Sequence, residues 1–142
     1  MAKKEAVTES KKTPEEQNQE LRSLIAQIEA LRAEVALVNQ SIAALQSTQA
    51  TLATMKELGK GKAMLIPVGS IVQVQAKVED VEQVVIDIGG NLSVELPYQE
   101  ALEYLNKQLA GLRDQRRLLE EAIAALYARA EDLLGEVRGE SK

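Results

Sequence analysis

Few residues in this chain have side chains that could do chemistry, and the first candidate is the stretch Gly59-Lys60-Gly61-Lys62. Glycines beside a lysine are typical of a phosphate-binding loop, but such a loop needs a strand before it and Ser or Thr directly after the lysine. In this chain a helical pattern precedes the stretch and Ala63 follows it. We therefore interpret the stretch as a helix terminator with two solvated lysines.

The acidic residues offer no better case for catalysis. Asp80, Glu82 and Asp87 lie near predicted strands, but none is paired with a second carboxylate, a base or a nucleophile as acid–base catalysis requires. The chain has no Cys and no His, which removes thiolate and imidazole metal ligands. We expect no enzyme activity, no metal site and no cofactor.

The charges and the polar motifs also argue against nucleic acid and membrane partners. Arg113, Arg116 and Arg117 cluster, but the net charge is −5, so we interpret them as a solvated or interhelical face. Asn39 and Asn91 each begin a glycosylation pattern, yet the N-terminus lacks the apolar segment of a signal peptide. No apolar run approaches the roughly 18 residues that a membrane span needs. We expect a cytoplasmic protein that binds neither nucleic acid nor membrane.

Two long helices are predicted on either side of the middle of the chain. Thr13, Pro14 and Glu16 form a helix start, with a capping box and proline at the first helical position. Apolar residues then recur in heptads, which indicates a coiled-coil seam. The a and d series are Leu21, Ile28, Val35, Ile42, Gln49 and Lys56 with Leu24, Leu31, Val38, Leu45 and Leu52, and then Leu102, Leu109, Arg116, Ile123, Ala130 and Val137 with Leu105, Leu112, Leu119, Leu126 and Leu133.

The middle segment changes to the period of two that is typical of strands. Val72, Val74 and Val78 alternate with polar residues, and two glycine turns, Gly69-Ser70 and Gly89-Gly90-Asn91, punctuate the segment. We predict two tandem hairpins, with a two-residue turn at Gly69-Ser70. A four-stranded meander with one apolar face cannot bury that face alone, so we expect this segment to oligomerise.

The predicted fold is therefore mainly α with a small β part: a long antiparallel two-helix coiled coil joined by two tandem β-hairpins that form an oligomerisation sheet. An intermolecular parallel coil is the alternative. We divide the chain into a mobile tail at 1–12, a helix at 13–58, the hairpins as an assembly module at 59–97, a second helix at 98–138 and a tail at 139–142.

Two apolar sets follow from this arrangement. The first lies where the first helix begins and the second ends, and it marks a partner site unless the helices simply fray there: Leu21, Leu24, Ile25, Leu133, Leu134 and Val137. The second set would join copies of the chain through the strands: Met64, Ile66, Val72, Val74, Val78, Val84, Ile86, Ile88 and Val94.

The hairpin segments resemble the alpha class of prefoldin subunits. Residues 64–70 are similar to the first hairpin of that class, 84–96 to its second hairpin, and 97–105 to the start of its second helix. Residues 25–34 and 124–133 are most similar to gamma-prefoldin, an alpha-like relative that forms filaments.

This resemblance implies an ATP-independent chaperone, a holdase that grips non-native polypeptides with the first apolar set. It implies three kinds of partner: protein clients, further copies of the chain in a homo-oligomer or filament, or beta-class prefoldin subunits in a hetero-hexamer. The alternative function is a self-assembling structural filament or scaffold without clients.

Overall fold

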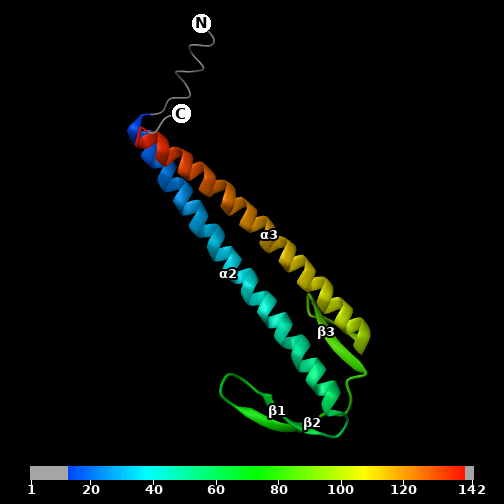
Figure 1. The fold of residues 1–142 in the computed structure, drawn as a ribbon. Helices are drawn as coiled ribbons and strands as arrows, with labels where there is room; N and C mark the ends of the chain where they lie inside the picture. Colours follow the sequence, from blue (N-terminus) through cyan, green and yellow to red (C-terminus); the bar gives the residue numbers. More distant parts are fainter. Residues whose placement is uncertain (1–12, 140–142) are drawn as a thin grey trace. The chain divides into compact units, whose positions relative to one another are not determined.

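The computed structural model describes residues 13–139 and consists of two long helices with four short strands between them (Figure 1). The elements are α2 (Pro14–Leu58), β1 (Ala63–Pro67), β2 (Gln73–Lys77), β3 (Gln83–Gly89), β4 (Leu92–Pro97) and α3 (Tyr98–Val137). This confirms the predicted fold class. The predicted tail at 1–12 and residues 140–142 lie outside the described residues.

The start of α2 is fixed by the predicted capping box. The backbone N–H of Glu16 donates to Thr13 Oγ1 (3.1 Å), and the N–H of Thr13 donates to Glu16 Oε1 (2.9 Å). These two bonds satisfy donors that the first helical turn leaves without partners. The helix ends at Leu58, before Gly59, whose positive φ of 84° suits glycine.

The described chain divides into two compact units. The helix-pair unit comprises residues 13–39 and 114–139, and the hairpin unit comprises residues 40–113. Within each unit α2 and α3 run antiparallel: Arg129 reaches Glu20 in the first, and Gln49 reaches Asn106 in the second. The parallel intermolecular coil is therefore not needed to pair these helices.

The heptad residues form the seam in both units. Leu24, Ile28, Val38, Ala130 and Leu133 are buried in the helix-pair unit. In the hairpin unit the buried apolar residues are Ile42, Val78, Tyr98, Ala101, Leu105 and Leu109. Nearly all of these helical residues occupy a or d positions, so burial of the predicted stripe is what pairs the helices. Within residues 13–139, no helix combines the length and the apolar character that crossing a bilayer requires.

The four strands form two separate two-stranded sheets instead of one meander. Hairpin 1 pairs β1 with β2, and hairpin 2 pairs β3 with β4, both antiparallel. No ladder joins β2 to β3 in the described chain. The expected four-stranded meander is therefore wrong within one chain. Each hairpin is a separate sheet, and its outer strand edges have no partner strand in the described chain.

The turn of hairpin 1 also differs from the prediction. Val68 N–H donates to the carbonyl of Val72 (2.8 Å), so the loop is Gly69-Ser70-Ile71 and has three residues. A two-residue turn would place Ile66 opposite Gln73. The longer loop pairs Ile66 with Val74, which keeps the apolar residues on one face. In hairpin 2, Gly90 and Asn91 both have φ near +60°, as a tight two-residue hairpin turn requires.

Candidate interaction surfaces

The first predicted apolar set divides into seam residues and accessible residues. Leu24 and Leu133 are 6% and 0% exposed and form a small core with Ala130, against which Leu21 packs. Ile25 and Val137 are 46% and 41% exposed. Leu134 is half-buried. The structure therefore uses Leu24 and Leu133 to hold the helices together, and it leaves Ile25 and Val137 open to solvent.

Part of the exposed apolar surface of the helix-pair unit lies on one side of the seam, whereas Leu37 and Leu118 are exposed at c positions elsewhere. Ile25, Tyr127 and Leu134 all occupy e positions, which flank the seam on a common side when two helices run antiparallel. Arg32, another e residue, crosses to α3: it donates a hydrogen bond to the Tyr127 hydroxyl, and its guanidinium carbon lies 5.1 Å from the ring centroid. Tyr127 itself is 41% exposed. We call Ile25, Tyr127, Leu134 and Val137 the helix-pair patch.

Polar contacts across the seam set the register of the helices. Arg116 occupies an a position and donates to Asn39 Oδ1 (2.8 Å), and Gln49, also at a, donates to Asn106 Oδ1 (2.7 Å). Polar residues at a positions favour one register and weaken the alternatives.

The arginines near the middle of α3 are engaged within the protein. Arg117 bridges the carboxylates of Asp114 and Glu121, each 2.7 Å away. Their hydrogen bonds raise the pKa of Arg117 above its ordinary value. Together with the contact of Arg116 to Asn39, this accounts for two of the three clustered arginines as interhelical or surface contacts.

The second predicted set lies on one face of each hairpin. Met64 stands opposite Ala76 and Ile66 opposite Val74, and in hairpin 2 Ile86 stands opposite Val94. Val78 is buried in its own chain, and Met64, Val84, Ile86 and Val94 are half-buried. The exposed members are Ile66, Val72, Val74 and Ile88, between 43% and 53% accessible.

The prediction missed a further group of exposed apolar residues in the hairpins: Leu65, Val68, Ile71, Val85 and Leu92. Ile71 is 92% exposed at the loop of hairpin 1. Leu65 and Val85 stand opposite Gln75 and Glu95, on the polar faces. The apolar side chains of Leu65 and Val85 break the alternation of period two. This break is visible in the sequence and could have identified these two residues.

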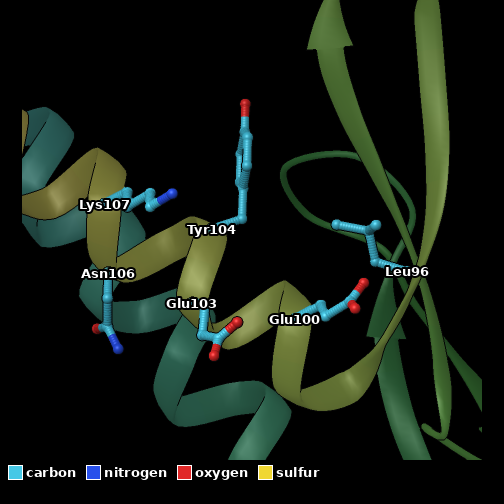
Figure 2. A pocket seen from close by; sticks show the side chains of 6 residues that line it. All are labelled: Leu96, Glu100, Glu103, Tyr104, Asn106 and Lys107. Carbon is cyan, nitrogen blue, oxygen red and sulfur yellow. The ribbon is translucent and has the colours of Figure 1, made fainter.

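A shallow depression of about 670 Å³ lies between β4 and the start of α3 (Figure 2). Leu96 and Tyr104 project from β4 and α3 beside it, with Glu100, Glu103, Asn106 and Lys107 along the helix. This lining offers no nucleophile with an adjacent base. Among residues 13–139, no group of three His, Cys, Asp or Glu side chains is placed to hold a metal ion.

The glycine-lysine stretch contributes backbone hydrogen bonds to hairpin 1. The N–H of Gly61 donates to the carbonyl of Val78 (2.6 Å), and Lys62 accepts from the N–H of Val78 (3.0 Å). These bonds extend the ladder of hairpin 1. An α-helix precedes the stretch and a strand follows it, which is the reverse of a phosphate loop.

Comparison with known proteins decides the family. Residues 24–141 match the family described as Prefoldin subunit. A protein of Aquifex aeolicus described as a prefoldin alpha subunit is 50% identical over 134 residues, which cover 92% of this chain and 90% of that protein. The chain belongs to the prefoldin family. Prefoldin subunit alpha 2 of Methanocaldococcus jannaschii is 48% identical over 125 residues, covering 88% of this chain and 85% of that one.

A solved prefoldin structure has the same fold. The cryo-EM structure of filamentous prefoldin from Methanocaldococcus jannaschii matches with a TM-score of 0.75 and 50% identity, covering 84% of this chain and 98% of that one. The resemblance to alpha-class prefoldins, and to a filament-forming relative in particular, is confirmed. Membership of the prefoldin family implies a chaperone function, and oligomerisation is a general feature of the family.

Proposed function

We propose that this chain is an ATP-independent holdase that captures non-native polypeptides on the helix-pair patch. The observation that carries the proposal is apolar exposure beyond what the seam requires. Leu24, Ala130 and Leu133 already bury the seam, yet Ile25 and Val137 remain 46% and 41% exposed beside it. Apolar side chains that stay in contact with water without a structural role are typical of a binding surface.

The chemistry of the patch suits unfolded chains better than one folded partner. Isoleucine, leucine and valine offer contacts without directional bonds, and Tyr127 adds a ring with a polar edge. Such a surface accepts any extended segment with apolar side chains, which is how a holdase must work. ATP is not part of this proposal, because the only glycine-lysine stretch is built into the ladder of hairpin 1.

Assembly through the hairpins would place several patches in one particle. Ile66, Val72, Val74 and Ile88 expose apolar surface that a single chain leaves open to solvent. Covering them with another copy gives a homo-oligomer or filament, and covering them with beta-class prefoldin subunits gives a hetero-hexamer. Several weak patches on one platform bind one client far more tightly than a single patch, because the second contact is intramolecular.

The test compares two double variants in suppressing the aggregation of a denatured client without ATP. Ile25→Ser with Val137→Ser should abolish suppression, because both residues belong to the helix-pair patch and are exposed. Leu37→Ser with Leu118→Ser is the matched control: these residues are 62% and 54% exposed but occupy c positions outside the patch. Equal loss of suppression in both variants would overturn the proposal.

A self-assembling filament or scaffold without clients is the second candidate. It is favoured by the extent of exposed apolar surface on the hairpins and by the likeness to a filamentous prefoldin. The two functions differ in one result of the same assay. Wild-type protein that assembles but leaves client aggregation unchanged at several-fold molar excess supports the scaffold.

A further inference from the structure

One side of the depression between β4 and the start of α3 combines three different kinds of side chain (Figure 2). Tyr104 stands out from α3, with Leu96 and Glu100 on one side of it and Lys107 on the other. Leu96 and Tyr104 are half-buried, and Glu100 is exposed. An aromatic ring, an aliphatic side chain and a carboxylate therefore border the same opening.

The ring of Tyr104 differs from the rings of the other two tyrosines in the chain. Lys56 Nζ lies 4.3 Å from the ring centroid of Tyr98. The guanidinium carbon of Arg32 lies 5.1 Å from the ring centroid of Tyr127. In the described part of the chain, no cation lies over the ring of Tyr104. Because the face of an aromatic ring attracts a cation, Tyr104 offers a cation site that the described chain leaves open.

Glu100 supplies a negative charge beside this ring. Among the described residues, no ion pair or hydrogen bond engages its carboxylate, although Lys107 lines the same depression. The surrounding sequence has the same sign: from Glu79 to Asn106 the chain has seven acidic residues and no basic one. This excess of negative charge attracts cationic groups and repels anionic ones. The charge around the depression therefore favours a cationic ligand.

Arginine suits the three groups better than lysine does. Its planar guanidinium can stack on an aromatic ring and donate hydrogen bonds to a carboxylate, while its aliphatic stem contacts apolar side chains. The stem would lie against Leu96, and the guanidinium would lie between Tyr104 and Glu100. A volume of about 670 Å³ is within the range typical of ligand sites, but the depression is open to solvent. A small free cation would make few contacts there, whereas a polypeptide adds contacts from the residues beside its arginine.

We propose that this depression binds an arginine side chain of a polypeptide partner, between the ring of Tyr104 and the carboxylate of Glu100. The site lies within the hairpin unit, so the inference does not depend on client capture by the helix-pair patch. The two surfaces select different segments: the patch accepts apolar side chains, and the depression requires a positive charge.

Fluorescence anisotropy of a labelled peptide mixed with the full-length protein tests the site. The probe is a short peptide of glycine and serine with two arginines and one leucine, and a second peptide has glutamine in place of both arginines. Tyr104→Leu keeps an apolar side chain without the ring, and Glu100→Gln keeps the shape without the charge. Each should raise the Kd of the arginine peptide about three- to tenfold and leave the weaker binding of the glutamine peptide unchanged.

Two control variants match these changes outside the depression. Glu95→Gln removes a charge from the same acidic stretch, on the opposite face of β4 from Leu96, and Tyr127→Leu removes a ring from the helix-pair patch. Both should bind the arginine peptide as wild type does, and circular dichroism should show that all four variants keep their helices. Because Glu100 is exposed, Glu100→Gln decides the outcome even if Tyr104→Leu unfolds. Equal binding of the two peptides by wild type, unchanged binding by Glu100→Gln, or an equal loss in either control overturns the inference.

Discussion

Leu133→Ala should destabilise the helix pair without acting directly on clients. Leu133 is fully buried and packs with Leu24 and Ala130, while Leu21 and Leu126 close the cluster from either side. Truncating a buried leucine costs about 2–5 kcal/mol, depending on how far the surroundings collapse. A core between only two helices collapses readily, so we expect the lower part of that range, about 2–3 kcal/mol.

For a chain of this length each kcal/mol lowers the midpoint of thermal unfolding by about 3–4 °C. Leu133→Ala should therefore unfold about 6–12 °C below wild type, measured by circular dichroism at one protein concentration because assembly contributes to stability. The matched control is Leu118→Ala, a truncation of the same size on a 54% exposed leucine of the same helix, which should cost under about 0.5 kcal/mol. An unchanged midpoint in Leu133→Ala together with lost client binding would refute the reasoning and make Leu133 a client contact.

Two other substitutions test the seam and the hairpins. Arg116→Leu should raise the unfolding midpoint, because an apolar a residue replaces the polar contact to Asn39, but it should also allow other registers. Disulfide trapping between cysteines placed on α2 and α3 would detect the added registers, and a single trapped register would contradict this. Gly90→Val should weaken hairpin 2 by about 1–2 kcal/mol, since its φ of +61° disfavours a branched side chain. Assembly should then need more protein, whereas unchanged assembly would show that this turn is dispensable.

The helices and the pairing of strands into hairpins could be predicted because each depends on a local period. Heptads from Leu21 to Lys56 and from Leu102 to Val137 place leucines where a second helix must cover them. The length of the loop in hairpin 1 could not be read from its glycine alone. It follows from the need to keep Ile66 and Val74 on one face, and a two-residue turn breaks that match.

The accessible part of the first apolar set required the structure. The prediction placed Leu24 and Ile25 in one set because both lie near the same helix end. Successive residues point in different directions around a helix, so Leu24 lies in the seam and is 6% exposed, while Ile25 is 46% exposed. Ile71 escaped prediction for a related reason. It is 92% exposed because it lies in the three-residue loop of hairpin 1 and not on a paired strand.

Site-specific photocrosslinking tests the central claim, client capture on the helix-pair patch, most directly. A photoreactive amino acid at exposed Arg22, three residues before Ile25 on the same helical face, should crosslink a denatured client. The same amino acid at Leu37, which is 62% exposed outside the patch, should crosslink several-fold less. Equal or stronger crosslinking from position 37 would contradict the proposed client site.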